Sequence, residues 1–357
     1  MLKPPMDLAT FETKAGDVSS LLRAMANTRR LMVLCKLVEH GEMTVGDLAG
    51  EVALSQSALS QHLAKMRDEN LVTFRRESQT LWYRIADPAT RDAAVIDPVL
   101  DFDLVSGEAD VRSAERILAF AADHSWRIVM VLETHAHADH LSAAPFFKAK
   151  TGAAIGIGEH IRDVQKIFRP VFAFDDLKTD GSDFDRLFRD GERFAIGELE
   201  VEVLHVPGHT PADVAYLIGD AAFVGDTLFM PDYGTARADF PGGDARQLYR
   251  SIRRVLSLPD GTRLFLCHDY KAPGREEFAW ETTVGEQRRT SVHVNDSVSE
   301  DVFVAMREAR DATLSPPKLL LPSIQVNIRA GNFPEAEANG VRFLRIPVKI
   351  KTQDEAT

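Results

Sequence analysis

The stretch LETHAHADHLSA, residues 132–143, carries three histidines and one aspartate within six consecutive positions. It begins where the apolar run RIVMVL (127–132) ends, and such a run is typical of a buried strand. The residues after the cluster, HLSAAPFFKAKTG (140–152), predict a helix closed by Gly152. Nitrogen and oxygen donors gathered at one strand end make this stretch a candidate metal site.

Three later segments place a histidine or an aspartate at the end of a predicted strand. They are LEVEVLHVPGHT (199–210), AAFVGDTLF (221–229) and TRLFLCHDY (262–270), the last read as a strand that reaches His268. The C-terminal ends of strands are the usual location of sites in mixed sheets, so these positions are expected to meet. A single histidine there is more often structural, but repetition in four segments predicts one metal centre. The seven donors are His135, His137, Asp139, His140, His209, Asp226 and His268.

The first 86 residues show a different pattern. After two amphipathic helical segments, a short helix from Thr44 and the segment LSQSALSQHLAKMRDENLV (54–72) predict a helix-turn-helix. VTFRRESQTLWYRIA (72–86) then predicts a hairpin that serves as a wing. The alternative is a helical interaction domain whose polar face is only solvated. The residues expected to face DNA are Ser55, Gln56, Ser57, Ser60 and Gln61 on the helix and Arg75 and Arg76 in the wing.

Charge is unevenly divided along the chain of 357 residues, whose net charge is −12. Residues 1–86 carry 11 Lys/Arg and 10 Asp/Glu, whereas the remainder carries 31 and 44. Because the acidic part would repel a polyanion, DNA contacts are expected in the first 86 residues alone. Two cysteines, and a sequence without a signal peptide or a bilayer-spanning apolar run, predict a cytoplasmic protein without membrane contact.

The segment MANTRRLMVLCKLVEHGEMTVGDLAGEVALSQSALSQHLAKMRDENLVTFRRESQTLWY resembles ArsR-type winged-helix repressors, most of all their sulfide-responsive branch. The resemblance implies a homodimer on operator DNA. Persulfide-sensing members use two cysteines, and only the first has a counterpart, Cys35. The second lies on a C-terminal helix, which RDAAVIDPVLDFD (91–103) replaces with a predicted strand and turn. Cys35 is thus a possible thiol sensor, although its register with Leu31 and Leu34 favours core packing.

The motifs THAHADH (134–140), PGHT (207–210), GDTLF (225–229) and CHDY (267–270) together resemble the metallo-β-lactamase superfamily. This resemblance implies an αββα four-layer sandwich with helices outside two facing sheets. The expected fold class is therefore α+β with two domains. Residues 1–86 would form an ArsR-like winged-helix DNA-binding domain and residues 87–357 a metallo-β-lactamase-fold catalytic domain.

Read only as chemistry, the seven donors suffice for two Zn(II) ions. One ion would take His135, His137 and His209. The other would take Asp139, His140 and His268, with Asp226 as a bridge. Such a pair generates hydroxide near neutral pH, which is the glyoxalase II-like, thioester-hydrolysing alternative.

The second reading uses fewer ligands. His135, His209 and Asp226 form a two-histidine, one-carboxylate triad, which leaves open positions on Fe(II). The remaining donors, His137, Asp139, His140 and His268, would then orient these ligands. Neither the number nor the spacing of the donors decides between the two readings. A third possibility is a regulator whose metal domain binds a sulfur ligand without turnover.

Residues 84–350 resemble persulfide dioxygenases, whose iron ligands match His135, His209 and Asp226. The resemblance implies one Fe(II) per chain and a reaction of a persulfide, such as glutathione persulfide, with O2. GTARADF (234–240) matches part of the family's next motif. Arg237 in it is a candidate for binding a substrate carboxylate, with an ion pair to Asp239 as the structural alternative.

Two further positions bear on the substrate. Tyr270 follows His268 closely and is a candidate for lining the pocket, with packing as the alternative. Where glutathione-using members of the family carry a cysteine, this chain has Thr235.

Overall fold

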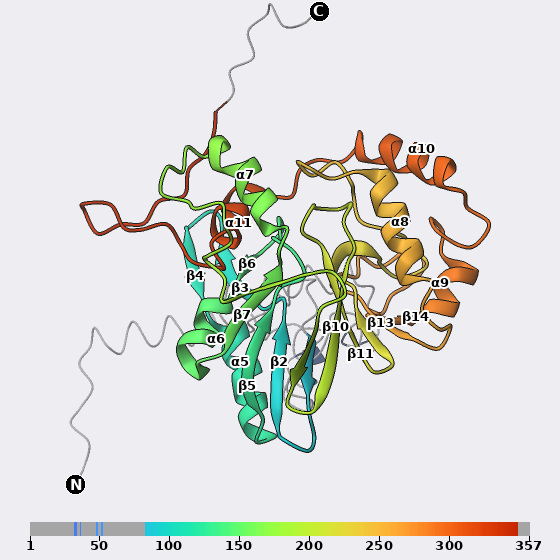
Figure 1. Ribbon diagram of the computed structural model, residues 1–357, viewed down its shortest axis with the longest axis horizontal. Coiled ribbons are helices and arrows are strands. Elements are labelled where there is room, and N and C mark those ends of the chain that lie inside the picture. The colour runs from blue at the N-terminus through green and yellow to red at the C-terminus, as the bar shows by residue number, and fades with distance from the viewer. Residues whose placement is uncertain (1–31, 34–35, 37–47, 49–50, 53–82, 349–357) are drawn as a thin grey trace, which may run out of the picture. The chain divides into compact units, whose positions relative to one another are not determined.

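The chain divides into two compact units, Met1–Ser78 and Gln79–Thr357. In the computed structural model (Figure 1) the described residues are 32–33, 36, 48, 51–52 and 83–348. Most of the predicted helix-turn-helix lies outside the described residues, and so do Cys35 and the residues expected to face DNA, from Ser55 to Arg76. The strand β1 (Tyr83–Ala86), expected in the first domain, pairs with β2 (Asp92–Ile96) of the larger unit, so the division falls before the expected boundary at residue 86.

The larger unit contains a five-stranded sheet with the order β1-β2-β5-β7-β8. Its other strands are β5 (Arg127–Leu132), β7 (Ala154–Gly158) and β8 (Arg186–Phe188). β1 runs antiparallel to β2, and the remaining neighbours are parallel. The segments RDAAVID and RIVMVL, which are predicted to form strands, contain β2 and β5. Four successive buried residues in β2 are typical of a strand covered on both faces.

A six-stranded sheet has the order β14-β13-β12-β11-β10-β9 and is antiparallel except between β12 and β13. Its strands are β9 (Arg193–Ile196), β10 (Leu199–His205), β11 (Val214–Ile218), β12 (Ala221–Phe223), β13 (Arg263–Phe265) and β14 (Glu281–Thr283). The hairpin between β11 and β12 turns at Gly219 and Asp220. β13 ends at Phe265, before the predicted position at His268, although the Leu266 N–H still donates to the Trp280 carbonyl at 3.0 Å.

Successive residues of each strand point to opposite faces, and this alternation builds the layers. Ala94 and Ile96 of β2 share a buried cluster with Val201 and Tyr216 of the second sheet. Val95, between the two β2 residues, instead joins a cluster with the helices on the other side of the first sheet. The two sheets therefore face each other across an apolar core.

Helices cover the outer face of each sheet (Figure 1). Beside the first sheet lie α5 (Arg112–Asp123), α6 (Ala144–Thr151), α7 (Ile161–Val171) and α11 (Leu320–Asn327). Beside the second lie α8 (Ala245–Val255), α9 (Val284–Thr290) and α10 (Glu300–Asp311). α6 ends at Gly152 in the left-handed conformation, as predicted. The αββα sandwich expected for the second domain is confirmed.

A small third sheet, with the order β4-β3-β6, lies beside the first. It consists of β3 (Val99–Asp103), β4 (Glu108–Asp110) and β6 (Leu141–Ser142). β6 follows the histidine cluster directly and pairs with β3. The cluster is therefore held between two paired strands, β5 before it and β6 after it. Within the described part of the chain, every helix is too short or too polar to cross a membrane.

Candidate metal centre

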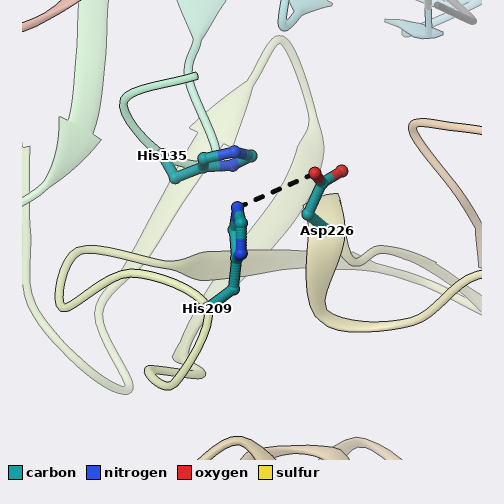
Figure 2. Close-up of side chains that lie close together, drawn as sticks. All are labelled: His135, His209 and Asp226. Atoms are coloured by element: carbon teal, nitrogen blue, oxygen red, sulfur yellow. Dashed lines mark ion pairs between the residues drawn. The ribbon is translucent and has the colours of Figure 1, made fainter. Parts of the chain in front are cut away.

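Donors that are far apart in sequence converge beyond the strand ends. His135 follows β5, His209 follows β10, and Asp226 lies in the short 3-10 helix η1 (Gly225–Thr227) after β12. One donor atom from each of these three residues lies within 4.8 Å of the other two. Figure 2 shows the two imidazoles and the carboxylate pointing toward a common point, with His209 Nε2 3.8 Å from Asp226 Oδ2. The predicted triad is thus assembled in space.

The remaining donors lie beside this triad. His137, Asp139 and His140 form a second group whose donor atoms lie within 4.8 Å of one another. His268 connects the groups, because its Nε2 lies 3.2 Å from Asp139 Oδ2 and 3.5 Å from Asp226 Oδ1. The structure therefore brings together all seven residues that the sequence singles out.

Several of the converging donor atoms are better suited to binding a metal than to forming hydrogen bonds with one another. His135 Nε2, His140 Nε2 and Asp226 Oδ1 are buried, and none has a hydrogen-bond partner among residues 83–348. Buried polar atoms are normally paired, since an unpaired one costs about 1–3 kcal/mol. Nitrogen and oxygen donors of this kind suit zinc and iron. The residues present therefore form a metal-binding site.

The protonation of the donors suits this role. Burial, together with the neighbouring rings of His137 and His209, holds the pKa of His135 well below its ordinary value, so its imidazole is neutral. Burial opposes ionisation of Asp139, but the imidazoles of His268 and His140 outweigh it and keep the pKa of this carboxyl well below its usual range. A neutral imidazole and an ionised carboxylate are the forms that bind metals.

Contacts behind the ligands set their direction. His209 Nδ1 lies 2.7 Å from the Arg237 carbonyl oxygen, so Nδ1 carries the proton and donates it. His135 Nδ1 lies 3.0 Å from Thr134 Oγ1. With Nδ1 engaged in both residues, Nε2 is the atom presented to the centre.

Asp97 and Glu133, which the sequence pattern does not single out, also belong to the centre. Asp97 follows β2, accepts hydrogen bonds from the backbone N–H of Thr134 (2.7 Å) and its hydroxyl (2.9 Å), and lies 3.0 Å from His137 Nε2. Burial disfavours the charged form of His137, but the Asp97 and Glu133 carboxylates outweigh it and raise its pKa to about 10. Since Nε2 faces Asp97, Nδ1 is the His137 atom left for the centre, and it can bind a metal only after it loses its proton.

The guanidinium of Arg237 is already engaged. It forms a bidentate pair with Asp239, at 2.5 and 2.7 Å, and donates to the Ser315 carbonyl at 2.8 Å. This geometry favours the structural alternative over binding of a substrate carboxylate.

The ring of Tyr270, by contrast, lies at the edge of the centre. Its centroid is 5.7 Å from that of His268 and 4.9 Å from that of Tyr233, on which it stacks. Its side chain is 38% exposed, which leaves it accessible to a bound molecule.

Cys267 and Thr235 are both buried beside the site. The Cys267 thiol donates to Asp97 at 3.2 Å, and burial raises its pKa well above the ordinary value, so it stays protonated and inert. The backbone N–H of Thr235 donates to His293 Nδ1 at 3.2 Å.

Gly208 allows the His209 loop to approach α8. Its φ is +141°, and an added Cβ would lie 2.2 Å from the backbone nitrogen of Leu248. Gly208→Ala is therefore expected to lower the free energy of unfolding by at least about 2 kcal/mol, measured by urea denaturation. At Gly219, also at positive φ (+59°), an added Cβ would meet open space within the described structure. Gly219→Ala is expected to cost only about 1 kcal/mol, and equal losses would contradict this account.

Comparison with known proteins agrees with this fold and site. Residues 75–268 match the metallo-beta-lactamase superfamily, and residues 27–73 match the bacterial regulatory protein arsR family. The chain belongs to the metallo-beta-lactamase superfamily. It joins such a domain to an ArsR-family helix-turn-helix, a domain type that binds DNA, which confirms the predicted combination.

The similar proteins fall into two functional groups by name. A probable metallo-hydrolase of Burkholderia pseudomallei is 52% identical over 75% of this chain and 95% of its own length. The beta-lactamase hydrolase-like protein of Agrobacterium fabrum is 53% identical over 75% of this chain, which spans only 62% of that relative. The bovine mitochondrial persulfide dioxygenase ETHE1 is 27% identical over 80% of this chain and 98% of its own length. The crystal structure of ETHE1 from Myxococcus xanthus superposes with a TM-score of 0.58 at 32% identity, over 73% of this chain and 98% of that one.

Proposed function

We propose that the chain is an iron-dependent persulfide dioxygenase fused to a DNA-binding regulatory domain. The reaction takes R–S–SH, O2 and water to R–SH, sulfite and two protons. The sulfane sulfur is oxidised, O2 is reduced, and the S–S bond breaks to release the thiol. The observation that carries the proposal is the convergence of His135, His209 and Asp226, which offers one Fe(II) two imidazoles and one carboxylate.

The likeness to ETHE1, which extends over nearly the whole of both ETHE1 chains, supports this proposal because the bovine relative is named a persulfide dioxygenase, and a reaction with O2 calls for a redox-active metal such as iron instead of zinc. Bound Fe(II) supplies the redox chemistry with O2 that protein side chains lack. The chain's own residues hold and orient it. The Arg237 carbonyl directs His209, and Asp139 and His268 hold each other beside Asp226. Tyr270 offers its ring as one wall for the persulfide.

Product analysis tests this proposal directly. Glutathione persulfide is mixed with the full chain loaded with Fe(II), and sulfite, glutathione and oxygen are measured. The proposal expects equal amounts of sulfite and thiol formed per O2 consumed. Thiol release without oxygen consumption would contradict it.

The second candidate is a dinuclear zinc hydrolase acting on a thioester. The group of His137, Asp139 and His140, with His268 at its side, favours it because these donors lie close enough together for a second metal, although this grouping assigns His137 to the second ion and not to the first with His135 and His209. The 52% identity to a probable metallo-hydrolase also favours it. In this reaction water adds to the thioester carbonyl and the thiol leaves, so no oxygen is consumed.

The amino-terminal domain is proposed to bind an operator as a dimer, whichever reaction the metal domain performs. Gln56→Ala combined with Ser60→Ala is expected to weaken binding to a duplex selected from random DNA by about tenfold or more, since each lost base contact costs about 1–3 kcal/mol. Fluorescence anisotropy at fixed salt measures it. Oxygen uptake should be unchanged in the same variant. Undiminished DNA binding would contradict these contacts and favour a solvated helix face.

The third possibility, regulation without turnover, differs in one outcome. A metal domain that only senses would change operator affinity on adding persulfide, yet would form no sulfite. Equal operator affinity in metal-free, iron-loaded and persulfide-treated protein would instead mean that the state of the metal domain does not affect DNA binding.

A further inference from the structure

One loop stands directly behind the ligand His209. It comprises residues 234–240, between η1 and α8, and is called the support loop below. The carbonyl oxygen of Arg237 in this loop accepts the hydrogen bond from His209 Nδ1 at 2.7 Å. The position of that one carbonyl therefore decides where Nε2 of His209 points.

A buried ion pair on α10 lies against the support loop. Arg307 and Asp311 are one helical turn apart, with side chains only 1% and 5% exposed. Asp311 Oδ1 accepts from Arg307 Nε at 3.0 Å and from Nη2 at 2.6 Å. Burying two charges is costly, and replacing such a pair with apolar residues is often neutral or stabilising. Stability alone is thus a weak reason for this pair.

The remaining polar atoms of the pair bind the support loop on both sides of Arg237. Arg307 Nη1 donates to the carbonyl of Thr235 at 3.1 Å. Asp311 Oδ2 accepts from the backbone N–H of Ala238 at 2.8 Å. The guanidinium of Arg237 adds a third contact, to the Ser315 carbonyl just beyond α10. The Ala238 N–H and the Arg237 carbonyl belong to one peptide group, so Asp311 fixes that group directly to the helix, and Arg307 fixes the peptide group between Thr235 and Ala236.

We infer that the Arg307–Asp311 pair is a positioning device for His209, acting through the Arg237 carbonyl. The pair touches neither metal nor substrate. It holds the support loop so that His209 is already aimed before a metal binds, which lowers the reorganisation that binding requires. This inference rests on the proposed metal centre.

Other contacts already dock α10 on its neighbours. Glu300 at its first turn pairs with Arg250 of α8 at 3.0 Å and also with Arg246. Phe303 fills the core beneath the helix and is fully buried. Because these contacts attach the helix without reaching the support loop, Glu300 provides a matched control.

The test compares Arg307→Met/Asp311→Leu with Glu300→Gln in the full chain, stripped of metal and titrated with Co(II) against a chelating dye. The double variant removes both charges together, so neither is left buried and unpaired. Its Co(II) dissociation constant is expected to rise about tenfold, the lower end of what loss of an orienting partner costs. The visible absorption of bound Co(II) should shift as well, because it depends on the geometry of the ligands. Glu300→Gln should match the wild type in both readouts.

Arg307→Lys covers the case in which the double variant fails to fold. Lysine keeps the charge pair with Asp311 but lacks the fork that also reaches Thr235, so affinity should fall by a smaller factor. If any folded variant of the pair keeps the wild-type Co(II) affinity and spectrum, this inference is overturned while the metal centre itself still stands. If the wild-type chain itself binds no Co(II), the metal centre fails and this inference fails with it.

Discussion

Asp226→Ala is expected to abolish persulfide-dependent oxygen uptake, with a loss greater than about 100-fold. Loss of a residue that only orients a ligand costs about 10- to 100-fold, and Asp226 is itself placed as a ligand. It offers the triad's only carboxylate, and its Oδ1 lies buried without a hydrogen-bond partner in the described structure. Uptake and bound iron should fall together, measured with an oxygen electrode and by elemental analysis.

Asp220→Ala provides the control for this prediction. Asp220 is exposed at the tip of the β11–β12 hairpin, on the element that leads to Asp226. Its replacement should leave both iron content and uptake unchanged. An Asp226→Ala protein that keeps its iron and more than about a tenth of its activity would exclude this residue as a ligand.

Truncation of His140 separates the one-metal and two-metal readings. In the iron reading His140 only supports the ligands, so His140→Ala should keep about one iron per chain and lose about 10- to 100-fold in rate. In the dinuclear reading it holds the second metal, and the same change should halve the metal content and end hydrolysis. The expected result is the first, measured as metal per chain together with turnover.

His135→Ala is the companion to that experiment. His135 belongs to the triad, so its loss should empty the centre where His140→Ala does not. Equal metal loss in the two variants would contradict the division of the seven donors into ligands and supporting residues.

The site residues that could be predicted from the sequence are the histidines and aspartates that come after a predicted strand. His135, His209 and Asp226 each follow a strand. β10 and β12 run in the same direction in the second sheet and therefore end at one edge, whereas β5 belongs to the first sheet, so His135 joins them only because the two sheets pack face to face. The same rule applies to Asp97 after β2. It was missed because one aspartate after a strand carries little signal until the strand is known to lie beside β5.

Other features depend on which partner a strand or side chain finds in the folded domain, and local pattern does not encode that choice. Residues 83–86 continue a plausible wing in sequence, but β1 finds its partner in β2. Arg237 matched a substrate-binding motif, yet its guanidinium is taken by Asp239 and Ser315, the latter 78 residues away. Arg307 reaches Thr235 across 72 residues of sequence. Such contacts follow from packing of the whole domain.

The central claim is tested most directly by the metal content of the purified chain, measured together with oxygen uptake on addition of glutathione persulfide. The account predicts about one iron per chain and rapid uptake, as a two-histidine, one-carboxylate centre requires. About two zinc ions per chain without uptake would contradict it and identify a dinuclear hydrolase.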